Sequence, residues 1–98
     1  MSLRVTFREQ AEDDVDAATA WYSSERPALA LAFLDRLDHV LRRVQESPRQ
    51  FPEVSAGIRR GLMSRFPYGV FFKVFDDRVV VLAVLHLHRH PETWKTRK

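Results

Sequence analysis

The sequence of 98 residues contains no cysteine. This absence excludes disulfide bonds and thiolate zinc sites, and it suits a reducing compartment such as the cytoplasm. Glycine is scarce too, because only Gly57, Gly61 and Gly69 are present, and they form no phosphate-cradling loop. No serine lies in a nucleophile elbow. Nucleotide-binding and common hydrolase functions are therefore not expected, and we predict neither a cofactor nor a metal.

Long apolar runs are also missing. The longest, Val79 to Leu85, is far shorter than the roughly 20 residues with which a helix crosses a bilayer. Arg4, Arg8 and Glu9 interrupt the beginning of the chain, so we expect no secretion signal there. We predict a cytoplasmic protein that makes no use of membranes, folded as a single domain over residues 1–98.

The two parts of the chain have net charges of opposite sign. Residues 1–57 hold seven Arg or Lys and ten Asp or Glu, whereas residues 58–98 hold nine and three. The basic part would attract a polyanion or an acidic protein surface, although a solvated sheet edge has the same composition. Charge alone therefore does not decide between a nucleic acid and a protein as partner.

Apolar periodicity predicts one strand followed by two helices. Residues 3–8 alternate between apolar and polar, which is typical of a strand with one buried face. From Glu9 onward the apolar spacing becomes three and four, which indicates an amphipathic helix. Ser23 to Arg26 is predicted as a short turn, and Pro27 suits the first turn of a second helix, which ends at Ser47. The two helices should form a hairpin.

The acidic residues of the first helix have two possible roles. Glu12, Asp13, Asp14 and Asp16 could bind a metal, but no alternating calcium-loop pattern is present. Acids near the beginning of a helix also interact favourably with its dipole. We favour this second role.

The rest of the chain predicts a small sheet. The segment up to Gly57 lacks a regular period and is predicted as a connecting loop. Strands are predicted over Ile58–Met63, Tyr68–Phe75 and Val79–His88, with a tight turn at Asp76 and Asp77. The predicted fold is α+β, with the order β-α-α-β-β-β and a helical hairpin packed on one face of a mostly antiparallel sheet.

The last strand is apolar on both faces. Val79 to Leu87 shows no alternation of polar and apolar residues, so we predict a central strand with one face under the helices. The other face needs a cover as well. A partner chain is one candidate for it.

Three histidines alternate at the end of this strand, and three roles are open for them. His86, His88 and His90 would project from one face if the strand continued. They could bind a metal, although a further ligand is not evident. They could transfer protons on a phosphate ester, with Arg65 and Arg89 stabilising the charge. They could also be structural and close the strand end, with Trp94 folded back over apolar surface.

The chain resembles the RelE/ParE superfamily of bacterial type II toxins in several motifs. These are an acidic first helix with Trp21 and Tyr22, the pattern P-x-L-A-x-x-F-x-x-x-L from Pro27, R-F-P-Y-G-V, and V-L-H-L-H-R-H-P-E-T-W. The resemblance spans nearly the whole chain. It implies a small toxin that forms a hetero-oligomer with a cognate antitoxin.

The superfamily includes two activities. RelE-like members cut messenger RNA in the ribosome without a metal, whereas ParE-like members block DNA gyrase by binding. Arg65 followed by P-Y-G-V-F-F-K-V, together with an H-x-x-R-x-P ending, resembles the ParE branch. A lysine-rich strand and a terminal tyrosine, typical of some ribosome-dependent nucleases, are missing.

We therefore expect a gyrase-binding toxin. The residues expected to bind the target or the antitoxin are Arg59, Arg60, Arg65, Lys73, Arg89 and Trp94. In the alternative, a ribosome-dependent endoribonuclease acting through the 2′-hydroxyl of the RNA, His86, His88, Arg89 and Arg65 would be catalytic. A non-toxic member that only binds antitoxin is the third possibility.

Overall fold

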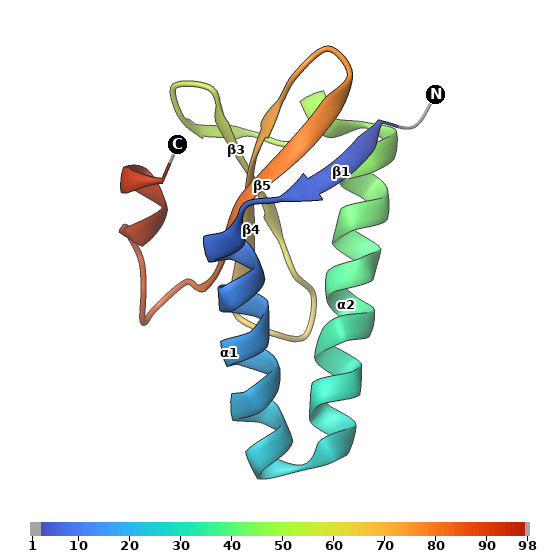
Figure 1. The fold of residues 1–98 in the computed structure, drawn as a ribbon, viewed down its shortest axis with the longest axis vertical. Coiled ribbons are helices and arrows are strands. Elements are labelled where there is room, and N and C mark those ends of the chain that lie inside the picture. The colour runs from blue at the N-terminus through green and yellow to red at the C-terminus, as the bar shows by residue number, and fades with distance from the viewer. Residues whose placement is uncertain (1–2, 98) are drawn as a thin grey trace.

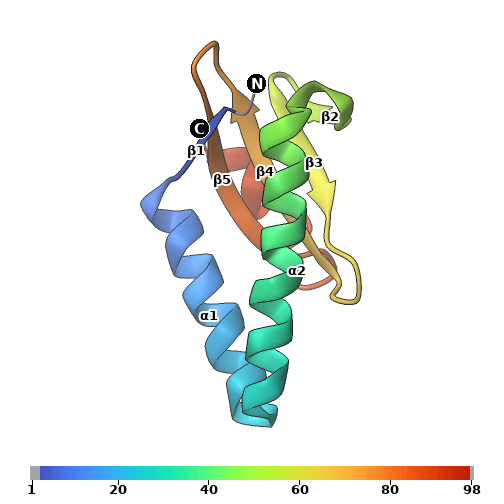
Figure 2. The same ribbon diagram turned by 90° about the vertical axis from the view of Figure 1, so that its right-hand side faces the viewer.

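The computed structural model describes residues 3–97 as two long helices on one face of a five-stranded sheet (Figures 1 and 2). The elements in chain order are β1 (Arg4–Phe7), α1 (Glu9–Glu25), α2 (Pro27–Glu46), the 3-10 helix η1 (Pro48–Gln50), β2 (Glu53–Ser55), β3 (Ile58–Leu62), β4 (Tyr68–Val74), β5 (Arg78–His86) and the 3-10 helix η2 (Thr93–Thr96). Within this part of the chain, no helix is long and apolar enough to cross a membrane.

The sheet has the strand order β1-β5-β4-β3-β2. The strand β1 pairs with β5 in parallel, and every other pair is antiparallel. The predicted α+β class, with its helical hairpin on one face of a mostly antiparallel sheet, is confirmed. The predicted interior position of β5 is confirmed as well, since β1 and β4 flank it.

The turn between the helices is shorter than predicted. The helix α1 continues through Ser23 to Glu25, and only Arg26 separates it from α2, so the predicted turn at Ser23–Arg26 is wrong. The backbone N–H of Arg26 donates to the carbonyl of Tyr22 at 2.9 Å, which extends the helical bonding to its last residue. Pro27 is the first residue of α2, as predicted.

The segment before Gly57 is more regular than a loop. It contains η1 and the short strand β2, in which Glu53 lies opposite Arg59 of β3. Gly57 has a φ of 76°, a conformation that glycine adopts without steric cost, and it makes the turn between β2 and β3. The predicted hairpin between β4 and β5 is confirmed, with the N–H of Phe75 donating to the carbonyl of Arg78 at 2.8 Å.

Both faces of the sheet carry an apolar cluster. The inner cluster joins α1 and α2 to the sheet and includes Phe33, Leu37 and Phe72. The outer cluster is formed by Ile58, Phe71, Val80, Leu82, Ala83, Leu85 and Trp94. The chain itself therefore supplies a cover for the second face of β5, where a partner chain was one expectation.

Trp94 is the main contact between the C-terminal segment and the outer face. Its ring stacks on Phe71 with 4.9 Å between centroids and 10° between planes, and 5% of the residue is exposed. The indole N–H donates to the carbonyl of Pro91 at 2.9 Å, so its polar atom is satisfied. The expectation that Trp94 folds back over apolar surface is confirmed.

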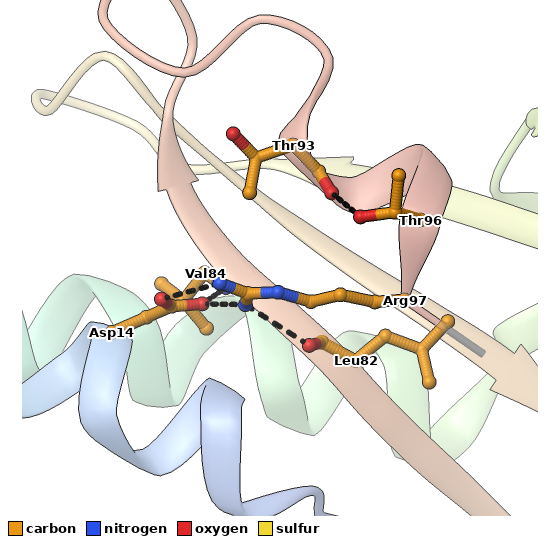
Figure 3. A network of polar contacts seen from close by, with 6 residues as sticks. All are labelled: Asp14, Leu82, Val84, Thr93, Thr96 and Arg97. Atoms are coloured by element: carbon orange, nitrogen blue, oxygen red, sulfur yellow. Dashed lines mark hydrogen bonds and ion pairs between the residues drawn. The ribbon is translucent and has the colours of Figure 1, made fainter.

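A largely buried ion pair, with side chains 11% exposed for Asp14 and 15% exposed for Arg97, fixes the last described turn of the chain (Figure 3). The carboxylate of Asp14 accepts two hydrogen bonds from the guanidinium of Arg97. It also accepts the backbone N–H of Val84 at 2.9 Å, and Arg97 donates to the carbonyl of Leu82 at 3.3 Å. These backbone groups lie on either side of a β-bulge in β5. Phe71 of β4 pairs with Ala83 and the next residue, Phe72, pairs with Val81, so Leu82 is the extra residue between them. Asp14 therefore joins α1, β5 and the C-terminal segment.

Candidate functional site

A cluster of four aromatic rings supports one end of the sheet. Tyr22 and Phe33 come from the helices, and Phe66 and Tyr68 come from the loop before β4 and its first residue. Ring centroids lie 5.0 Å apart for the Tyr22–Phe66 and Phe33–Tyr68 pairs, both edge to face. This packing gives the surface groups above it a rigid base.

Two candidate segments meet at this end. Tyr68 of β4 lies opposite His86 of β5, and the backbone N–H of Leu87 donates to the carbonyl of Pro67 at 2.9 Å. The loop between β3 and β4 and the turn after β5 are therefore neighbours. Arg65 in the loop and Arg89 in the turn therefore lie at the same end of the sheet.

Arg89 is held by aromatic groups on two sides. Its guanidinium carbon lies 5.1 Å from the ring centroid of Trp21, and an Nη atom donates to the hydroxyl of Tyr68 at 3.4 Å. Among residues 3–97, no carboxylate forms an ion pair with Arg89. A cavity of about 180 Å³ lies beside these residues, lined also by His86 and His90. The arrangement presents an oriented cation that has unused donors.

His86 closes the turn that carries Arg89. Its Nδ1 accepts the backbone N–H groups of His88 and Arg89, each at 3.2 Å, so the proton of the neutral ring lies on Nε2. Burial lowers the pKa of His86 below its ordinary value of 6.5, and the charges of Arg89, His88 and His90 lower it further. His86 is therefore neutral near pH 7, and its Nδ1 already has a structural role.

The predicted strand Val79–His88 ends two residues earlier than expected, so the three histidines do not share one strand face. The strand β5 ends at His86, and the chain then turns, so that His88 and His90 are exposed in the turn. The rings of His86 and His88 are neighbours, with 5.8 Å between their centroids. Within residues 3–97, no three histidine or acidic side chains come together as metal ligands.

Tyr68 supports Arg89 as a neutral phenol. Burial raises the pKa of Tyr68 above its ordinary value of 10.0, the neighbouring Tyr22 raises it further, and Arg89 opposes both effects. The hydroxyl is therefore protonated at neutral pH and accepts the hydrogen bond from Arg89. Tyr68 therefore orients the guanidinium of Arg89 through this hydrogen bond.

Arg65 has a strained backbone. Its φ of 72° is the only positive value at a residue other than glycine within residues 3–97. The side chain is exposed, and its guanidinium carbon lies 5.8 Å from the ring centroid of Phe66. Such strain is frequently found where a side chain must be aimed at a partner.

The remaining predicted binding residues are dispersed. Arg59 donates to the carbonyl of Phe51 at 2.6 Å and lies 3.5 Å from a carboxylate oxygen of Glu53, which joins β3 to the preceding segment. Arg60, which lies opposite Phe71, and Lys73, which lies opposite Val80, are on the outer face instead.

Arg60 and Trp94 differ from the rest in burial. The Nε of Arg60 is buried and has no hydrogen-bond partner within residues 3–97. Trp94 is in the outer core, so its ring is not available at the surface of the chain described here. Of the predicted binding residues, Arg89 lines the same cavity as His86 and His90, and Arg65 lies in the neighbouring loop at the same end of the sheet.

Trp21 and Tyr68 belong to the site although sequence reasoning did not assign them to it. Trp21 is 52% exposed, which is unusual for so large an apolar side chain, and it lies beside the apolar stripe of its helix. This position beside the apolar stripe is the sequence feature that could have indicated an exposed tryptophan available for binding. The contact with Arg89 joins residues 68 positions apart and is invisible to any local pattern.

Comparison with known proteins agrees along most of the chain. The family model described as "ParE toxin of type II toxin-antitoxin system, parDE" matches residues 5–91. Similar relatives include the protein called Toxin ParE2 in two strains of Mycobacterium tuberculosis, CDC 1551 / Oshkosh and ATCC 25618 / H37Rv. Each is 27% identical over 96 residues, which cover 93% of this chain and 88% of the relative.

A solved structure has the same fold. It is described as "Chromosomal ParDE TA system from P. aeruginosa" and superimposes with a TM-score of 0.76 over 87% of this chain and 96% of that chain. The two sequences are 20% identical, so the likeness concerns the fold.

Proposed function

Since the chain belongs to the ParE family of toxins from type II toxin–antitoxin systems, we propose that it inhibits DNA gyrase by binding to it. Gyrase is proposed as the target because it is the target of the ParE branch that the sequence resembles. The observation that carries the proposal is the arrangement of Arg89, which is oriented by Trp21 and Tyr68 and has no ion-pair partner within residues 3–97.

An arginine beside an exposed tryptophan is typical of a protein-binding surface. Arg, Trp and Tyr are the residues most enriched among those that dominate the energy of protein interfaces. A preorganised guanidinium loses little side-chain entropy when it binds a carboxylate of the partner. Arg65 reaches the surface from the neighbouring loop and would add a second cation. We propose these two arginines as the principal contacts with gyrase.

The chemistry of the site supports binding over hydrolysis. Proton transfer needs groups that can take up and release a proton near neutral pH. The Nδ1 of His86 is occupied by two backbone N–H groups, and the phenol of Tyr68 has a raised pKa. The exposed His88 could transfer protons, so it separates the two mechanisms in an experiment.

We further propose that an antitoxin binds this chain and forms a hetero-oligomer with it. The solved relative is described as a ParDE system, which supports a partner of this class. Arg60 and Lys73 on the outer face are proposed antitoxin contacts, and Arg59 and Trp94 would act by holding β3 and the C-terminal segment in place. Because gyrase acts on chromosomal DNA in the bacterial cytoplasm, the proposal also places the chain there.

Inhibition of purified gyrase tests the proposal. Increasing amounts of the chain are added to a supercoiling reaction, and the inhibitory concentration is compared for the wild type, Arg89→Ala and Arg65→Ala. We expect an increase of about tenfold or more for Arg89→Ala, which is the effect of losing an important interface residue. The control is Arg42→Ala, which removes an exposed arginine of α2 with the same change of charge.

The His88→Ala variant distinguishes the mechanisms. The binding mechanism predicts unchanged inhibition, because His88 has no assigned contact with gyrase. Folded wild-type protein that leaves gyrase unaffected but cuts messenger RNA on ribosomes, with this cleavage lost in His88→Ala, would support the nuclease alternative. Folded protein without either activity would support the non-toxic member that binds only antitoxin.

A further inference from the structure

The strand β1 leaves one side of the sheet open. Among residues 3–97 it is the first strand of the sheet order and pairs only with β5, and the N–H of Leu3 just before it donates to the carbonyl of Gln45 in α2. The backbone N–H of Arg8 points toward β5, because it donates to the carbonyl of Val81. Successive residues of a strand direct their N–H and C=O groups to opposite sides, so those of Val5 and Phe7 point away from β5. An edge with free N–H and C=O groups can pair with an extended segment of another chain.

A cavity lies directly beside this edge. Its volume is about 400 Å³, and its apolar lining consists of Val5 and Phe7 of β1, Val15 of α1 and Leu37 of α2. In Figure 1, β1 crosses the wide end of the helical hairpin, between the beginning of α1 and the end of α2. A segment paired with β1 would therefore pass over this cavity, and alternate side chains of that segment would point into it.

Two carboxylates border the cavity on its α1 side. Glu12 and Asp16 are one helical turn apart, so they lie on the same face of α1. Both are exposed, and neither forms an ion pair within residues 3–97. The helix α1 contains six acidic residues and no Lys or Arg, so no cation of its own helix neutralises them. The site therefore favours a positively charged ligand group and disfavours a nucleic acid.

We propose that the β1 edge binds an extended segment of a partner protein that has an apolar side chain and a Lys or Arg two residues apart. The apolar side chain would occupy the cavity between Val5, Val15 and Leu37. The basic side chain would lie between Glu12 and Asp16, because residues two apart in a strand face the same side. This surface is separate from the arginine site, so the proposal does not depend on gyrase inhibition.

Binding of two synthetic peptides tests this proposal. The first is acetyl-Ser-Val-Thr-Leu-Thr-Lys-Thr-Ser-amide, and the second has Glu in place of Lys. Each is titrated into the isotope-labelled full chain, and the amide shifts are followed by NMR. We expect the lysine peptide to shift the amides of Val5 and Phe7 and to bind at least about tenfold more tightly than the glutamate peptide.

Charge reversal on α1 supplies the matched comparison. The double variant Glu12→Lys/Asp16→Lys should lose at least about tenfold in affinity for the lysine peptide and gain affinity for the glutamate peptide. The control Glu9→Lys/Asp13→Lys makes the same change of net charge on α1 outside the cavity lining, and it should retain the preference for lysine. Equal affinity for both peptides, shifts confined to other strands, or no binding at millimolar peptide would each overturn the proposal.

Discussion

Replacing Asp14 with alanine should destabilise the protein by about 3 kcal/mol. The carboxylate accepts hydrogen bonds from Arg97 and from the backbone N–H of Val84. Its side chain is 11% exposed and that of Arg97 is 15% exposed. The variant would leave a guanidinium and a backbone N–H without their acceptor in a poorly hydrated place.

The size of this loss of stability depends on whether Arg97 and the N–H of Val84 can form other hydrogen bonds in the variant. Removing one member of a buried ion pair costs about 3–5 kcal/mol, because the other charge is left uncompensated. The lower end of this range applies here, since Arg97 retains the carbonyl of Leu82 and its side chain is 15% exposed. A loss of this size is a large share of the roughly 5–15 kcal/mol that stabilises a typical domain.

Urea unfolding of wild type and variants measures the loss, and the chain contains a matched control. Asp38 and Arg42 on α2 form an ion pair at 2.9 Å, but their side chains are 56% and 75% exposed. Asp38→Ala should cost less than about 0.5 kcal/mol. Both substitutions replace Asp with Ala inside a helix, so the change in helix propensity is the same and cancels in the comparison. Equal and small losses for Asp14→Ala and Asp38→Ala would refute the view that the Asp14–Arg97 ion pair holds the C-terminal segment.

The other predictions concern Trp94, Arg65 and His86. Trp94→Ala should reduce the free energy of unfolding by about 3–5 kcal/mol, whereas Trp21→Ala, at a position 52% exposed, should cost less than about 1 kcal/mol in the same urea experiment. Arg65→Gly should stabilise the chain by up to about 1 kcal/mol, because it relieves the positive φ, and should also weaken gyrase inhibition; unchanged inhibition would count against a contact by Arg65. Because the pKa of His86 is lowered in the folded state, its contribution to stability is present above pH 6.5 and is lost as pH falls toward the folded pKa. His86→Asn, measured by unfolding at several pH values, should therefore show a shallower loss of stability in acid than the wild type.

Local periodicity predicts the long elements of this fold well. The stripe of α2 fixes its inner face, and Phe33 and Leu37 are indeed buried under it. The errors occur where a local pattern is weak or overridden. Ser23 to Glu25 are polar and suggest a turn, yet the helix continues because the carbonyl of Tyr22 accepts the N–H of Arg26. The strand β2 has three residues, too few to show a period.

The candidate site shows the same limit more strongly. Arg65 and Arg89 could be predicted as site residues because each lies in a recognisable motif near a strand end. The surroundings of Arg89 could not, since Trp21 and Tyr68 reach it only through the packing of α1 against β4 and β5. Likewise, the histidine alternation failed because His86 binds two backbone N–H groups that end the strand.

Pulse-labelling of bacteria after induction of this chain alone would decide most directly what it does. Incorporation of thymidine and of methionine is compared in the first minutes, for the wild type and for Arg89→Ala. Gyrase inhibition predicts that thymidine incorporation falls first and that Arg89→Ala slows this fall. An early fall in methionine incorporation with DNA synthesis intact would contradict it.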